Sequence, residues 1–297
     1  MRSTRSVSDA LGRTFEAPFS RIARTWSRIC TEGERVRRDR DRARGSMAPV
    51  SDMNKEPLER VNPKLASLTQ RPRERVETRE ENLNPVGRLP RRSMFFEQHL
   101  IGAMQNFGYV IGDPEAKAAA VIDPSFDARI LQKVARENGY TIGWIFNTHH
   151  HRDHIFDNER LADETGAKVA AHRLSEVRKD LVLEDGMIVA VGGLKVKVVH
   201  TPGHSPDSSC FIVAGRVFTG DCLFVGDCGR VDLPGSSVEQ MYDSLFQKVR
   251  KMDDALVVCP GHHYGKARTS TIGDEKRTNY TLQERSLEDF VRFMRSP

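Results

Sequence analysis

Long apolar runs and paired cysteines are both missing from this 297-residue sequence. No stretch approaches the roughly 18 apolar residues that a membrane-spanning helix requires, and the N-terminus lacks the pattern of a secretory signal. We therefore expect no membrane partner. The five cysteines are odd in number and form no CxxC pair, which argues against a disulfide framework and against a cysteine-based zinc site. This usage favours a reducing compartment, and the expected location is the cytoplasm.

The first third of the chain also has too few acidic residues to balance its basic residues. Residues 1–93 hold 22 Lys and Arg against 13 Asp and Glu, a net charge of +9, whereas residues 94–297 have a net charge of −4. Because residues 1–93 are rich in Arg, Ser, Glu and Pro and poor in apolar side chains, we expect a largely disordered basic extension. Such a tail attracts phosphate without reading sequence, so nucleic acid is not the expected partner.

Two other interpretations of this extension stay open. Apolar residues recur at helical spacing between residues 11 and 26, as in an Arg- and Ser-rich mitochondrial presequence, although Asp9 and Glu16 count against it. Alternatively, the natural start is Met94, where the first well-patterned segment begins.

Residues 94–297 have the pattern of one folded domain. Strands are expected at 95–102, 105–113, 118–125, 141–147, 167–172, 187–193, 194–200, 208–215, 216–221 and 255–261. Helices are expected at 127–138, 158–166, 237–252 and 286–294. Because grouped strands alternate with helices, the expected fold class is α/β (α+β), with two stacked sheets and helices outside. Homo-oligomerisation is left open.

Four of the ten histidines lie in one short segment, THHHRDH at 148–154. It follows an expected strand, in which alternate side chains share a face, so His149 and His151 can point one way while His150 points elsewhere. Asp153 and His154 follow within one turn, and a carboxylate beside an imidazole suits a second zinc or iron ion. A chance cluster or an affinity tag is the alternative, but a tag is terminal and lacks the aspartate.

Three further segments carry the same residue types at the ends of expected strands. HTPGHS presents His200 and His204, FTGDC presents Asp221, and CPGHHYG presents His262 and His263. Loops at strand ends commonly hold binding groups on a rigid scaffold. Convergence of these segments on one site is the economical explanation.

The series THHHRDH, HTPGHS, TGD and PGHHY, in this order, resembles the motifs of the metallo-β-lactamase superfamily over residues 94–297. The resemblance implies a four-layer αββα sandwich with two divalent metal ions at one edge, expected to be Zn²⁺, with Fe²⁺ as the alternative. It implies the following ligands: His149, His151 and His204 for the first ion, Asp153, His154 and His262 for the second, and Asp221 bridging both.

Two such ions would generate a metal-bound hydroxide at neutral pH and polarise a carbonyl. With Asp153 and Asp221 as the catalytic carboxylates, the expected activity is that of a metal-dependent hydrolase that cleaves a thioester. The loop DCLFVGDCGRVDLPGSS at 221–237 resembles the glyoxalase II-like and persulfide dioxygenase-like groups, which act on glutathione conjugates. This resemblance implies a small-molecule thiol conjugate as the substrate, with Arg230 and Tyr264 as candidate substrate-binding residues.

The same residues allow a second chemistry. In the dioxygenase group a Cys-Gly-Arg-Thr-Asp run follows the bridging aspartate, and this chain matches it at 228–232 except at Val231. The resemblance then implies a single iron held by His149, His204 and Asp221, acting on glutathione persulfide. The complete set of seven ligands favours the two-metal hydrolase, and the iron dioxygenase is the alternative.

Overall fold

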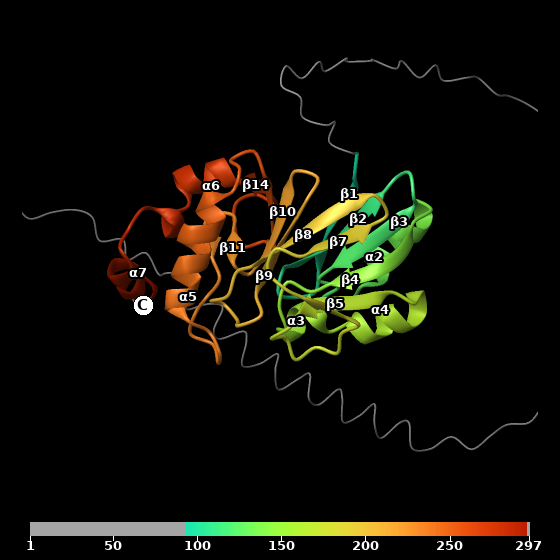
Figure 1. Ribbon diagram of the computed structural model, residues 1–297, viewed down its shortest axis with the longest axis horizontal. Coiled ribbons are helices and arrows are strands. Elements are labelled where there is room, and N and C mark those ends of the chain that lie inside the picture. Colours follow the sequence, from blue (N-terminus) through green and yellow to red (C-terminus); the bar gives the residue numbers. More distant parts are fainter. Residues whose placement is uncertain (1–92, 296–297) are drawn as a thin grey trace, which may run out of the picture. The chain divides into compact units, whose positions relative to one another are not determined.

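The computed structural model describes residues 93–295, which form two six-stranded sheets with helices outside them (Figure 1). The predicted extension, residues 1–93, lies outside the described residues except for Ser93. The segment between residues 11 and 26 that resembles a presequence lies outside them too. The expectation of two stacked sheets is confirmed.

The first sheet has the strand order β1-β2-β3-β4-β5-β6. Its strands are β1 (Phe95–Ile101), β2 (Asn106–Asp113), β3 (Ala118–Ile122), β4 (Thr141–Phe146), β5 (Lys168–His172) and β6 (Leu181–Leu183). The first three strands are antiparallel, whereas β3 to β6 are parallel to one another. Helices lie in the connections between β3 and β4 and between β4 and β5, whereas β5 and β6 are joined by a segment without a helix.

The second sheet has the strand order β14-β13-β10-β9-β8-β7. Its strands are β7 (Ile188–Val191), β8 (Leu194–His200), β9 (Ser209–Val213), β10 (Arg216–Gly220), β13 (Val257–Pro260) and β14 (Ser270–Thr271). The short strands β11 (Leu223–Phe224) and β12 (Asp227–Cys228) form a separate hairpin. Because β8 and β10 are both antiparallel to β9, and β10 is parallel to β13, the carboxyl ends of β8, β10 and β13 lie at one edge.

The main core lies between the two sheets. Strand β8 alternates buried Leu194, Val196 and Val198 with exposed Lys195 and Lys197, the pattern of a strand with one covered face. Strand β2 is buried at every position, because α2 covers its other face. Burial of apolar area is the main driving force for this packing.

Helices cover the outer faces of both sheets. The helices are α2 (Arg129–Glu137), α3 (Arg152–Ile155), α4 (Asn158–Thr165), α5 (Val238–Tyr242), η1 (Asp243–Lys248), η2 (Val249–Lys251), α6 (Ile272–Thr278), η3 (Tyr280–Leu282) and α7 (Leu287–Arg295). Figure 1 places α2 and α4 on the side of the first sheet and α5, α6 and α7 on the other side. Between residues 93 and 295, no helix has the length and apolarity needed to span a membrane.

The sequence pattern missed the smallest elements. The helix expected at 237–252 is divided into an α-helical turn, a π-helical turn and a 3₁₀ turn, because backbone hydrogen-bond spacing carries no signal in side-chain periodicity. The helix α6 was not expected, although Thr271 caps it by accepting a hydrogen bond from the Asp274 backbone N–H.

Candidate metal centre

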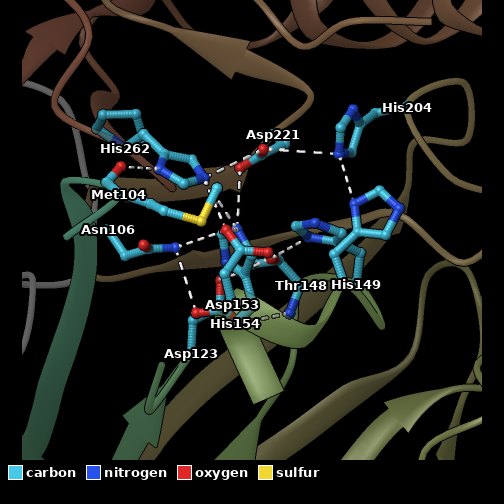
Figure 2. A network of polar contacts seen from close by, with 12 residues as sticks. Met104, Asn106, Asp123, Thr148, His149, Asp153, His154, His204, Asp221 and His262 are labelled. Atoms are coloured by element: carbon cyan, nitrogen blue, oxygen red, sulfur yellow. Dashed lines mark hydrogen bonds and ion pairs between the residues drawn. The ribbon is translucent and has the colours of Figure 1, made fainter. Parts of the chain in front are cut away.

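The predicted ligands all follow the carboxyl ends of strands that meet at one edge of the sandwich. The segment 148–154 follows β4, His204 follows β8, Asp221 follows β10 directly, and His262 follows β13. Strand direction therefore brings together groups that are more than a hundred positions apart (Figure 2). The structure gathers all seven predicted ligand residues into two clusters and a shared carboxylate.

The first cluster consists of His149, His151 and His204, whose ligand atoms lie within 4.8 Å of one another. Nδ1 of His151 lies 2.9 Å from Nε2 of His204. Burial, followed by the charge of neighbouring imidazoles, lowers the pKa of His149 and lowers that of His151 to about 4. Burial also lowers the pKa of His204. These rings are therefore neutral at pH 7, the form in which imidazole binds metal.

The second cluster consists of Asp153, His154 and His262, whose ligand atoms also lie within 4.8 Å of one another. The Nε2 atoms of the two histidines are 3.1 Å apart, and Asp153 Oδ2 lies 3.4 Å from that of His154 and 3.3 Å from that of His262. Burial opposes charge on both rings, but nearby carboxylates outweigh it. Asp153 and Asp221 raise the pKa of His154, and Asp221 and Asp153 raise that of His262 to about 9.

The carboxylate of Asp221 lies between the clusters. Its Oδ2 is 3.5 Å from Nε2 of His204 and 3.4 Å from Nε2 of His262, while Oδ1 is 3.4 Å from Nε2 of His154. Burial opposes ionisation of this group, but His262 and His154 lower its pKa well below the usual range. The buried Oδ1 has no hydrogen-bond partner among the described residues. A bound cation would supply the missing partner of this oxygen.

One buried carboxylate, Asp123, fixes an imidazole in each cluster. Its Oδ2 accepts from Nδ1 of His154 at 3.0 Å and from the Thr148 hydroxyl at 2.6 Å. Since that hydroxyl donates to Asp123, its oxygen is left to accept from Nδ1 of His149, 3.1 Å away. Both rings thus carry their proton on Nδ1 when neutral and present the lone pair of Nε2 to the centre.

Backbone carbonyls fix two more rings in the same way. Nδ1 of His204 donates to the Arg230 carbonyl at 2.9 Å, and Nδ1 of His262 donates to the Met104 carbonyl at 2.9 Å. In the neutral rings the inward Nε2 atoms are therefore acceptors. Lone pairs that face one another at about 3 Å repel unless a cation lies between them, so this donor set fits divalent ions of the zinc or iron type.

The three histidines of the motifs that have no predicted ligand role lie outside both clusters. As strand alternation predicts, His150 turns away, and its Nδ1 lies 2.6 Å from the buried Asp207 carboxylate. The ring of His200 stacks on His172 with centroids 4.0 Å apart. His263 packs against the ring of Phe107.

Arg230 and Tyr264 lie at the border of the centre. The Arg230 guanidinium pairs with Asp232, with N–O distances of 2.5 and 2.6 Å, while its carbonyl holds His204. Tyr264 stacks on His262, with centroids 4.5 Å apart and an interplanar angle of 10°. Their role in substrate binding stays a prediction. The residue between Cys228 and Arg230 must be small, because a Cβ on Gly229 would overlap the Asp221 carbonyl oxygen.

Two of the basic side chains near the C-terminus form ion pairs with nearby carboxylates. Lys276 pairs with Asp254 at 2.5 Å, and Arg277 pairs with Asp274 at 2.5 Å. The buried Glu275 instead accepts from the Gly226 N–H at 2.9 Å and so ties α6 to the β11–β12 hairpin. Helix α6 therefore supports the hairpin that precedes Arg230 in the chain.

Two polar residues that contact the second cluster, Asp123 and Asn106, were not predicted from the sequence. Asp123 has the signal that revealed Asp221, an acidic residue directly after a buried strand, but it lies outside the four motifs that carry the family resemblance. Asn106 carries no such signal, because it stands at the start of β2, where a polar residue is ordinary.

The chain belongs to the metallo-beta-lactamase superfamily, whose sequence model matches residues 101–262. Members of this superfamily bind divalent metals, in agreement with the donor set described above.

The relatives of this chain include proteins with two different named activities. Hydroxyacylglutathione hydrolase of Maricaulis maris is 36% identical over 183 residues, which are 60% of this chain and 70% of that protein. The mitochondrial persulfide dioxygenase ETHE1 of Homo sapiens is 31% identical over 192 residues, which are 63% of this chain and 75% of that protein. The crystal structure of ETHE1 from Myxococcus xanthus superposes with a TM-score of 0.66 and 32% identity, covering 68% of this chain and 92% of that chain.

Proposed function

We propose that this protein is a two-metal hydrolase that cleaves a thioester of glutathione or of a related thiol. The observation that carries the proposal is the position of Asp221, whose Oδ2 lies 3.5 Å from Nε2 of His204 and 3.4 Å from Nε2 of His262. A carboxylate within reach of both clusters suits two ions that share one bridging ligand. The similarity to hydroxyacylglutathione hydrolase supports the thioester as substrate.

The residues would divide the work as follows. The first and second clusters hold one divalent ion each, with Asp221 between them. Bound there, the ions lower the pKa of water toward neutrality and polarise the thioester carbonyl. Asp153 would bind the second ion through Oδ2, which faces His154 and His262, and its other carboxylate oxygen is left to accept a hydrogen bond from the attacking water and so orient it.

The border of the centre would hold the substrate. Arg230 is 23% exposed at its side chain and can exchange its Asp232 partner for a substrate carboxylate, since both pairings have the same fork geometry. The face of Tyr264 that is not stacked on His262 offers an apolar surface to the acyl group.

A second function is favoured by a specific observation. The loop Cys228–Asp232 matches the dioxygenase pattern except at Val231, and the relatives include ETHE1 of Homo sapiens and of Myxococcus xanthus. The second candidate is therefore a persulfide dioxygenase with one iron held by His149, His204 and Asp221.

One experiment separates the two functions. The protein is purified without added metal, its metal content is measured, and both S-lactoylglutathione and glutathione persulfide are assayed. Two zinc ions per chain with thioester cleavage would support the hydrolase. One iron per chain with oxygen uptake would support the dioxygenase instead.

A further inference from the structure

Asn106 contacts the second cluster without being one of its ligands. Its side chain is fully buried, and its Nδ2 donates to Asp153 twice, to Oδ2 at 2.9 Å and to the backbone carbonyl at 3.2 Å (Figure 2). The oxygen that accepts this hydrogen bond is also the oxygen that faces His154 and His262.

The other half of this amide is unsatisfied. Asn106 Oδ1 is buried and has no hydrogen-bond partner among the described residues. A buried acceptor without a partner destabilises the folded state, so packing alone would favour an apolar side chain at this position. The hydrogen bonds that its Nδ2 donates to Asp153 therefore explain why an amide occupies this position.

Geometry indicates what this donor does. A carboxylate oxygen has two lone pairs, and the amide engages one of them, which leaves the other directed at the second cluster. The carboxylate is thereby held in one rotamer with Oδ2 toward the two imidazoles. Without the amide, Asp153 could rotate about its terminal torsion, which has only a shallow preference.

The same strand start also supports His262. The Met104 carbonyl accepts from His262 Nδ1, and Asn106 forms an isolated antiparallel β-bridge with His262. The segment 104–106 therefore restrains two of the three members of the second cluster.

We propose that Asn106 is a positioning residue that sets the cation affinity of the second cluster independently of the first. This inference rests on the metal centre of the proposed function, not on its substrate. The presence or absence of this amide would then decide whether the chain binds one ion or two at a given metal concentration.

The test uses Asn106→Leu, which is similar in volume and removes both the donor and the unsatisfied acceptor, together with Asn106→Ala. The two Zn²⁺ dissociation constants of the full chain are measured by competition with a chromophoric chelator, and thermal unfolding is followed in parallel. We expect one of the two binding steps to lose about 10- to 100-fold in affinity and the other to change by less than about 3-fold. The leucine variant should keep the thermal stability of the parent.

Asn158→Ala is the matched control. Asn158 is equally buried, but its amide is paired with that of Asn147 at 2.7 and 3.1 Å and contacts neither cluster. It should lower thermal stability and leave both dissociation constants unchanged.

Three results would overturn the inference. These are equal loss at both binding steps, no loss at either step in the leucine variant, and a parent protein that takes up only one Zn²⁺ at millimolar metal. Failure to cleave S-lactoylglutathione would refute the proposed hydrolase alone, because the metal titration does not depend on the substrate.

Discussion

The first cluster offers three imidazoles to a cation, whereas the second offers a carboxylate and two imidazoles. Burial keeps the first set neutral, with the pKa of His151 lowered to about 4. In the second set, carboxylates overcome burial and raise the pKa of His262 to about 9. Two neighbouring sites on one fold therefore differ in charge although both are buried.

The hydrogen bonds around the clusters differ as well. Every member of the second cluster has an identified outer partner: Asn106 for Asp153, Asp123 for His154, and the Met104 carbonyl for His262. The first cluster shares Asp123 through Thr148, and the Arg230 backbone carbonyl accepts from His204. Outer partners orient ligands and tune affinity, so the clusters should respond differently to substitution.

The largest effect is expected where the two clusters meet. Asp221→Ala removes the carboxylate that lies within 3.5 Å of both, and leaves three buried imidazoles without their shared anion. We expect metal content and activity to be lost together, as measured by elemental analysis and thioester cleavage. Asp274→Ala, at an exposed carboxylate on α6, is the control and should lose neither.

A smaller effect on both clusters is expected at Asp123. Asp123→Ala frees Nδ1 of His154 and removes the acceptor of the Thr148 hydroxyl, so both Zn²⁺ affinities should fall by about 10- to 100-fold. Thr148→Val cuts only the branch that leads to His149, and should weaken one binding step. If Thr148→Val weakened both steps as strongly as Asp123→Ala, the branched arrangement would be wrong.

Local patterns in the sequence predicted two stacked sheets and a common face for His149 and His151, while the full set of seven ligands came from the resemblance to the metallo-β-lactamase superfamily. Strand alternation separates His150 from His149 and His151, and carboxyl ends of parallel-running strands share an edge. The first rule depends only on local periodicity, which a single sequence displays, whereas the relative strand directions come from the structure.

The outer partners could not be predicted in the same way. Asn106 meets Asp153 across 47 positions, and Asp123 meets His154 across 31, through contacts that depend on strand order and register. The backbone role of Arg230 was hidden too, because any residue type has a carbonyl to offer His204. The sequence singled out the Arg230 side chain as a candidate for substrate binding, whereas it is the Arg230 main-chain carbonyl that contacts His204.

The difference in pKa predicts a difference in proton release on metal binding. At pH 7 the first cluster is neutral, so an ion binding there displaces essentially no proton. His262, with a pKa of about 9, is protonated and must lose its proton to bind an ion. Second-cluster affinity should therefore rise with pH between 6 and 8, by about tenfold per unit for each proton released, while first-cluster affinity stays flat. Calorimetric titration in two buffers of different ionisation enthalpy counts the protons, and equal counts for both ions would refute this distinction.

The smallest effect on the centre is expected at His150, which lies between two ligands in sequence but bonds to Asp207. His150→Ala leaves that buried carboxylate with the Ser205 hydroxyl as a remaining side-chain donor, at 2.7 Å. We expect unfolding free energy to fall by about 1–3 kcal/mol, because a buried acceptor loses a hydrogen bond. Metal content and activity should stay close to those of the parent, since neither cluster loses a ligand. An emptied centre in this variant would mean that His150, not strand alternation, holds the neighbouring imidazoles in place.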